Sequence, residues 1–401
     1  MKRRIFSLLL ALCLIVGLLP SVAIPHAHAA ETAVEPGGAL DTNYVLTLGG
    51  YGEGTENQIV LTLKNYDTPI YTKNTVRTNG EFIKDGAVVY ADYMTQSKAD
   101  ETDWNAKLIW HTGDEGPTLY LNGFVYNNYN EEYGFRYRIS GKELYYYDAG
   151  IFTDSTAPLK IVLQGEDSVI NAYGGIHYQK PLTIESVGDT KLSMRVRKNG
   201  IMPKNSFNAY EGTNAGSSVN AGQLTLNANI DIVNVAGSSS SGAVITAKSG
   251  DIVINGGNIN ATTDLNMFAM RTITSGNIIV NGGYTYVKAL YRGVYTPSGY
   301  RTYVNGGTFY ARGGYSAVYV GGEGNSAMSY PVMPEGGCFT YQIKSSLTTT
   351  TTIQKSTYIK VTFHQPTEHP AVAVDSCFPG NTLYYSCDKC GKFYSDKWGT
   401  K

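Results

Sequence analysis

Three stretches of this sequence share one pattern and decide the fold. They are Asp251-Ile-Val-Ile-Asn-Gly-Gly-Asn-Ile-Asn-Ala261, Asn277-Ile-Ile-Val-Asn-Gly-Gly-Tyr-Thr-Tyr-Val287 and Arg301-Thr-Tyr-Val-Asn-Gly-Gly-Thr-Phe-Tyr-Ala311. Their Asn-Gly-Gly corners recur at Asn255, Asn281 and Asn305, at spacings of 26 and 24 residues. A recurrence of this length is typical of a solenoid, in which each unit buries its apolar side against its neighbours.

Each unit predicts three strands and three bends. A β-branched run such as Ile252–Ile254 predicts the first strand, and the glycines after it tolerate the positive φ of a turn. The second strand alternates, and a third apolar element begins 13 residues after each asparagine, at Phe268, Val294 and Val318. The predicted inward positions of the second strand are Ile259, Ala261, Thr285, Val287, Phe309 and Ala311. We therefore predict an all-β, right-handed parallel β-helix.

Weaker copies of the unit lie upstream, for example at 224–227 and 159–163. They predict roughly six or seven coils between about residues 118 and 322. A β-sandwich of short strands is the other architecture that the pattern allows. The regular Asn-Gly-Gly spacing, without hairpin-length loops, favours the β-helix.

The chain divides into five predicted regions. Lys2, Arg3 and Arg4, the apolar run 5–19 and Ala27-His28-Ala29 predict a signal peptide over residues 1–29. Export predicts an extracellular protein, secreted or associated with the cell surface, with no membrane insertion after cleavage. The other predicted regions are an N-terminal β region or cap (30–103), the parallel β-helix (104–344), a Ser/Thr linker or last strand (345–360) and a small Cys module (361–401).

The charge balance does not favour nucleic acid as a partner. Cleavage removes three of the 32 Lys and Arg residues and none of the 33 acidic ones, so the mature net charge is −4. Nucleic-acid-binding chains normally carry a strong basic excess. Gly (45) and Tyr (32) are abundant, which suits many short strands joined by turns. We expect a monomer.

The tyrosines indicate a binding surface. If Ile259 and Ala261 face inward, the same alternation turns Tyr284, Tyr286 and Tyr310 outward. Stacked coils lie about 4.8 Å apart, so Tyr286 and Tyr310 are predicted to share one external column, and Tyr295 and Tyr319 a second. Rings with hydroxyl edges suit both the CH face and the hydroxyls of a sugar. Packing on the β surface is the other interpretation. The predicted carbohydrate-binding residues are Tyr284, Tyr286, Tyr310, Tyr295 and Tyr319.

The C-terminal cysteines indicate a metal or a disulfide. Cys387-Asp-Lys-Cys390 precedes Gly391-Lys392, a turn that can aim two sulfurs at one tetrahedral zinc ion. Cys377 is the expected third ligand, and His369 or His364 the fourth. A zinc ribbon normally carries two Cys-x-x-Cys pairs, and this segment has one. Because an exported protein meets oxidising conditions, a disulfide stays open as the alternative. Cys338 is interpreted as a buried small apolar residue.

Two segments show resemblances. Residues 118–123, 159–169 and 175–193 carry a Leu-Asn-Gly opening, a strand ending near Gly-Glu-Asp-Ser and then a Leu-Thr-Ile strand. This resembles the secreted bacterial carbohydrate-binding β-helix family, whose fold is similar to that of pectate lyases. The resemblance implies binding of a plant cell-wall polysaccharide, pectin-like or cellulosic, sometimes with structural calcium. The C-terminal segment resembles short cysteine modules repeated at the ends of bacterial surface proteins.

Three functions follow from these observations. The first is an extracellular binder of an extended polysaccharide. The second is a polysaccharide lyase or glycoside hydrolase, which needs two carboxylates at one bond or a calcium cluster with a base. Acids are sparse in the repeats, and Asp231 and Asp251 are the pair that coil stacking could bring together. The third is a cell-surface adhesion or spacer protein. We expect binding rather than catalysis.

Overall fold

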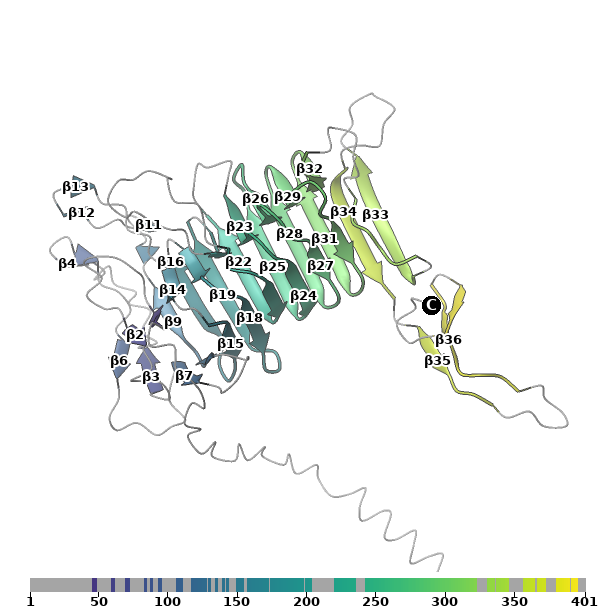
Figure 1. Ribbon diagram of the computed structural model, residues 1–401, viewed down its shortest axis with the longest axis horizontal. Coiled ribbons are helices and arrows are strands. Elements are labelled where there is room, and N and C mark those ends of the chain that lie inside the picture. Colours follow the sequence, from purple (N-terminus) through teal and green to yellow (C-terminus); the bar gives the residue numbers. More distant parts are fainter. Residues whose placement is uncertain are drawn as a thin grey trace, which may run out of the picture.

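In the computed structural model, the chain forms a parallel β-solenoid of about six turns, with no helix among the described residues (Figure 1). Between residues 45 and 110 the structure describes only the strands named below. From there it describes residues 117–127, 129–130, 134–135, 139–140, 142–143, 149–154, 157–172, 174–197, 199–203, 220–235, 242–322, 330–335, 337–345, 356–364, 366–372, 380–389 and 391–395.

Three sheets form the walls of the solenoid, and each coil contributes one strand to each wall. Sheet I contains β14 (Ala149–Asp154), β17 (Gly174–Tyr178), β20 (Ile201–Pro203), β23 (Ala243–Ala247), β26 (Phe268–Thr272), β29 (Arg292–Thr296) and β32 (Ser316–Val320). Sheet II contains β8 (Pro117–Leu121), β15 (Leu159–Leu163), β18 (Leu182–Ser186), β21 (Leu224–Asn227), β24 (Ile252–Gly256), β27 (Ile278–Val280) and β30 (Thr302–Val304). Sheet III contains β9 (Val125–Asn127), β16 (Ser168–Ala172), β19 (Lys191–Val196), β22 (Asn229–Asn234), β25 (Asn258–Thr263), β28 (Tyr284–Ala289) and β31 (Thr308–Gly313).

The Asn-Gly-Gly corners hold successive coils in register. The Asn281 side-chain amide donates to Asn255 Oδ1 at 2.9 Å, and Asn305 donates to Asn281 Oδ1 at the same distance. The last glycine of each corner has positive φ, 74° at Gly257 and 70° at Gly283. Strands across this region pair in parallel. The predicted all-β parallel β-helix is therefore confirmed, and the β-sandwich alternative is wrong.

The core runs along the inside of the three walls. Its side chains are the inward positions of each strand, and the six predicted from the repeat are fully buried, with 0% exposure: Ile259, Ala261, Thr285, Val287, Phe309 and Ala311. The third strand of each coil adds Met270, Val294 and Val318. Since each coil buries these residues only against the coils beside it, stability accumulates coil by coil.

Antiparallel strands border the parallel array at its first coils. β1 (Val45–Leu48) pairs with β14, and β2 (Ile59–Leu61) pairs with β1. On sheet II, β7 (Ala106–Trp110) pairs with β8. Further antiparallel pairs join β3 (Pro69–Thr72) to β7, β6 (Tyr93–Thr95) to β3, β4 (Ile83–Lys84) to β5 (Ala87–Val88), β10 (Tyr129–Asn130) to β11 (Gly134–Phe135) and β12 (Ile139–Ser140) to β13 (Lys142–Glu143).

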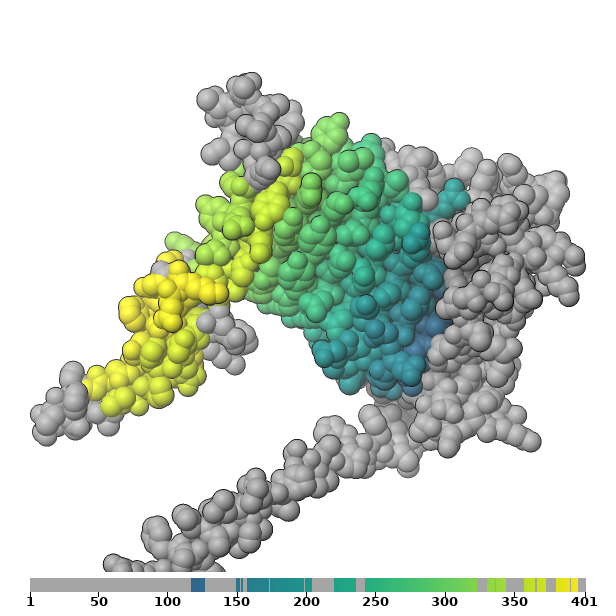
Figure 2. Space-filling view, turned by 180° about the vertical axis from the view of Figure 1, so that it is seen from behind, coloured from purple at the N-terminus to yellow at the C-terminus, as the bar shows by residue number. Residues whose placement is uncertain are grey.

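A hairpin closes the other end of sheet III, and we call it the cap. β34 (Ser356–Phe363) runs antiparallel to β31, and β33 (Phe339–Ser345) pairs with β34. Beyond the cap lies a separate three-stranded sheet, the C-terminal module, made of β35 (Thr367–His369), β36 (Tyr384–Cys387) and β37 (Lys392–Tyr394). In Figure 2 the cap and the module, in yellow-green and yellow, follow the teal and green solenoid. The paired cap strand satisfies the edge groups of β31 that would otherwise invite aggregation.

Several sequence predictions fall outside the part of the chain that the structure describes. These are the signal peptide, most of residues 30–103, residues 346–355 of the Ser/Thr run, Cys377 and Cys390. None of the described segments is a helix with the length and hydropathy that a bilayer span requires.

Candidate functional site

The outer face of sheet III carries three columns of side chains, one residue per strand. The central column contains Asn260, Tyr286 and Tyr310, which the parallel pairings place side by side. The flanking columns are Asn258, Tyr284 and Thr308 on one side and Thr262, Lys288 and Arg312 on the other. The cap continues the three columns with Lys360, Thr362 and Tyr358 of β34. We call this surface the sheet III face.

Tyr286 and Tyr310 stack in the central column as predicted. Their ring centroids are 4.6 Å apart, with an interplanar angle of 35°. Two rings this close cannot lie side by side in the plane of the sheet surface, so they pack against one another and present edges and hydroxyls to solvent. Tyr358 of the cap extends the row with an edge-on contact to Tyr310 at 4.9 Å. Tyr284, with 42% of its surface exposed, stands beside the row.

The Tyr310 hydroxyl is held in its protonated form. Burial raises its pKa, and the neighbouring Tyr286 and Tyr358 hydroxyls raise it further because ionised phenols would repel one another. A neutral phenol both donates and accepts a hydrogen bond. Tyr310 therefore keeps its hydroxyl proton through neutral and mildly alkaline pH.

Tyr295 and Tyr319 form the second predicted column, on a different wall. They lie in β29 and β32 of sheet I and stack at 5.9 Å with an interplanar angle of 17°. The Arg292 guanidinium lies 3.5 Å from the Tyr319 ring centre, and Phe268 lies 5.2 Å from the Tyr295 ring. The Arg292 guanidinium thus covers one face of the Tyr319 ring, and the sheet I pair is held by ring stacking and a cation–π contact. The five predicted tyrosines thus divide between two walls.

The carboxylates proposed for catalysis are not brought together. Asp231 lies on β22 of sheet III, where its Oδ1 accepts a hydrogen bond from the Asn260 amide at 2.8 Å. Asp251 precedes β24 of sheet II, and its Oδ1 accepts from the Asn277 backbone N–H at 2.6 Å. Because the two acids lie on different walls, coil stacking does not pair them. Each carries a bond that supports the stacking of adjacent coils.

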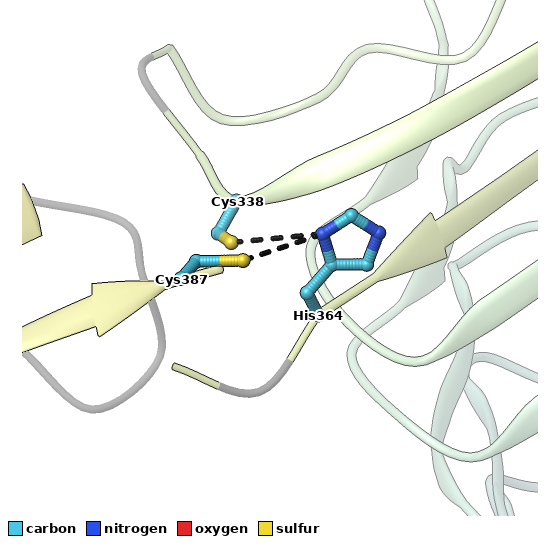
Figure 3. A group of neighbouring side chains, drawn as sticks. All are labelled: Cys338, His364 and Cys387. Atoms are coloured by element: carbon cyan, nitrogen blue, oxygen red, sulfur yellow. Dashed lines mark hydrogen bonds between the residues drawn. The ribbon is translucent and has the colours of Figure 1, made fainter. Parts of the chain in front are cut away.

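A buried group of soft ligands lies between the cap and the C-terminal module. Cys338, His364 and Cys387 are each less than a tenth exposed, and their ligand atoms all lie within 4.8 Å of one another (Figure 3). Cys338 directly precedes β33, His364 directly follows β34, and Cys387 ends β36. Because β33 and β34 pair antiparallel, the start of one strand faces the end of the other, and the His364 N–H donates to the Cys338 carbonyl at 2.9 Å.

The geometry of this group suits a tetrahedral metal. His364 Nδ1 lies 3.8 Å from Cys338 Sγ and 3.5 Å from Cys387 Sγ. A tetrahedral zinc ion with ordinary Zn–S and Zn–N bond lengths separates such atoms by about 3.6 Å. On the far side of the ring, Nε2 is 3.2 Å from Thr340 Oγ1. With the proton on Nε2, the ring donates to Thr340 and turns the free Nδ1 lone pair toward the sulfurs, as metal-binding histidines commonly do. The group could therefore hold a metal ion.

The imidazole at this position favours its neutral form. Burial lowers the pKa of His364, and the nearby Lys389 ammonium lowers it further. A histidine binds metal only when its ligand nitrogen is unprotonated.

The predicted metal ligands are only partly represented in this group. Cys387 belongs to it, and so does His364, the alternative to His369. Cys377 and Cys390 lie outside the described residues. His369 lies in β35, where its Nε2 is 2.7 Å from Ser386 Oγ and its ring stacks on Tyr384 at 4.5 Å. Cys338 is buried as expected, in a small cluster with Tyr385, Cys387 and Tyr394, and its sulfur also lies beside the His364 imidazole.

We call Cys338, His364 and Cys387 the metal-capable group. A shallow pocket of about 230 Å³ opens beside it. Lys389 of the module lines one side of this pocket. The cap lines the rest with Thr340, Gln342, Lys360, Thr362 and His364. The pocket thus continues the sheet III face up to the module.

Comparison of the chain with family models, with curated proteins and with solved structures finds no match.

Proposed function

We propose that this protein is an extracellular carbohydrate-binding protein that recognises an extended polysaccharide, pectin-like or cellulosic, along the sheet III face. The observation that carries the proposal is the row of Tyr286, Tyr310 and Tyr358, which crosses from the solenoid into the cap. Export of the chain and association with the cell surface are part of the same proposal.

The chemistry of the row supports a glycan ligand. A polysaccharide presents hydroxyls at a regular interval, and the sheet III face presents phenol, amide and ammonium groups at the strand spacing of about 4.8 Å. Asn260 precedes the tyrosines in this column, and Lys360 follows them on β34. Tyrosine edges combine an apolar rim with a hydroxyl, which matches the mixed surface of a sugar. An open face without deep walls suits a long chain, whereas a small molecule needs a pocket that buries most of its surface.

Replacing Tyr286 and Tyr310 together by alanine is expected to weaken glycan binding by about tenfold or more, because two hydroxyls and the apolar rims between them are lost. The measurement is a glycan array followed by affinity electrophoresis with the responding polysaccharide. The matched control is Tyr295→Ala with Tyr319→Ala, the stacked pair on sheet I, which should leave affinity unchanged. Equal losses in the two double variants, or wild-type mobility that no glycan alters, would contradict the proposal.

For the metal-capable group, we propose zinc as the ion. Two thiolates and one imidazole form a soft sulfur and nitrogen set, which zinc prefers and calcium does not. The competing state is a disulfide between Cys338 and Cys387, whose sulfurs lie within 4.8 Å. Metal analysis of the purified chain is expected to find about one zinc per molecule, with free thiols appearing after chelation. A metal-free protein in which peptide mapping finds Cys338 cross-linked to Cys387 would exclude zinc in favour of the disulfide.

A further inference from the structure

The metal-capable group has an unusual origin, because its ligands come from two separately built units. Cys338 and His364 flank the cap hairpin, which is tied to the solenoid through the β31–β34 pairing. Cys387 belongs to the C-terminal module, whose three strands form a sheet of their own. An ion held by all three residues would bridge the two units.

Among the described residues, the apolar contact at this junction is small. The buried cluster that they form consists of Cys338, Tyr385, Cys387 and Tyr394, so two of its four members are the candidate thiol ligands. A three-stranded module this short cannot build a core of its own, and such modules usually depend on a metal or a disulfide.

We infer that a zinc ion bound by Cys338, His364 and Cys387 locks the C-terminal module onto the cap of the solenoid. The inference rests on the proposed zinc and goes beyond it, because it assigns the ion a position between the units and a docking role. Metal-binding free energy at such a site becomes free energy of docking, since Cys338, His364 and Cys387 come together only when the two units are joined.

Docking by zinc also builds the pocket beside the site. Lys389 is the module's contribution to the pocket, and it lies two residues after Cys387. Release of the module would remove Lys389 from the end of the sheet III face. The metal therefore sets how far that face extends beyond Lys360.

The competing arrangement is the zinc knuckle predicted from the sequence, with Cys377, Cys387, Cys390 and either His369 or His364 as ligands. Cys338 belongs only to the group between the cap and the module, and Cys377 belongs only to the knuckle, so single substitutions separate the two ligand sets. Cys338→Ser in the full-length chain should reduce zinc from about one per molecule to near zero. His369→Ala, the matched histidine variant outside the group, should leave zinc in place.

The docking role is tested by hydrogen exchange on the wild-type chain, before and after chelation of zinc. We expect exchange to rise together at the start of β33, at the end of β34 and in β36, while peptides from β24 and β25 stay protected. Adding zinc back should restore protection at all three places. Because this comparison uses no variant, it stays decisive even if Cys338→Ser disturbs the fold of the cap.

The outcomes distinguish the inference from the zinc proposal. If His369→Ala or Cys377→Ser removes zinc while Cys338→Ser retains it, the ion lies within the module. The docking role is then overturned, although the proposal of zinc stands. Hydrogen exchange that rises in β36 alone overturns the docking role in the same way. A wild-type chain that binds no zinc under reducing conditions overturns both.

Discussion

Gly283→Ala is expected to lower the free energy of unfolding by about 3 kcal/mol or more. The residue has φ of 70°, a conformation that costs an L side chain about 1–2 kcal/mol. A Cβ at this position would lie 2.2 Å from the Gly257 carbonyl oxygen, which belongs to the backbone of the preceding coil and cannot rotate away. The coils would have to separate at that corner. Denaturant titration followed by circular dichroism measures the loss.

The matched control is Gly299→Ala. Gly299 has φ of 83°, yet nothing lies within 4 Å of the position that a Cβ would occupy. Only the backbone cost applies there, so we expect a loss of about 1–2 kcal/mol. If the two variants were equally stable, close approach of the coils at Asn-Gly-Gly corners would not contribute to the fold.

Leu226→Ala should destabilise the solenoid by about 2–5 kcal/mol. Leu226 lies in β21, is fully buried and belongs to the continuous core. Truncation removes its transfer free energy and leaves a cavity, because hydrogen-bonded coils on both sides prevent the walls from collapsing inward. The parallel neighbours Ile184 and Ile254 would border this cavity. Thermal unfolding monitored by calorimetry provides the measurement.

Leu290→Ala is the control for this substitution, since it makes the same chemical change on the surface of the same solenoid. Leu290 is 58% exposed, so its truncation should alter stability by no more than about 0.5 kcal/mol. Comparable losses at Leu226 and Leu290 would show that the interior is loosely packed.

The fold was predictable because its signal is local and repeats. The Asn-Gly-Gly corners specify both the length of a coil and the phase of the strand that follows, and all six inward positions derived from that phase are buried. The same phase turned Tyr286 and Tyr310 outward and into contact. The orientation of the rings was not predictable, because alternation states which side of a sheet a residue occupies and says nothing about its side-chain torsions.

The metal-capable group was only partly predicted, for a different reason. The Cys-x-x-Cys spacing draws attention to the module, whereas two of the three ligands flank the cap hairpin and have no place in the repeat. A signal was nevertheless present: Cys338 directly precedes one alternating strand and His364 directly follows the next. Antiparallel pairing of those strands brings the two residues together, as the partner pairs Phe339 and Phe363 show. The repeat spacing predicts only the parallel pairing of successive coils, so it cannot predict the antiparallel pairing of β33 with β34.

The side chains of Asn255, Asn281 and Asn305 form a hydrogen-bonded ladder, and this ladder has an evolutionary consequence. Each rung, such as the bond between Asn281 and Asn255, is identical to the next, so a duplicated coil finds the same partners above and below. Gene duplication of one unit would lengthen the molecule by a single strand spacing of about 4.8 Å and leave both ends unchanged. The length of the solenoid can therefore grow in steps of one coil without any change in the chemistry of its corners.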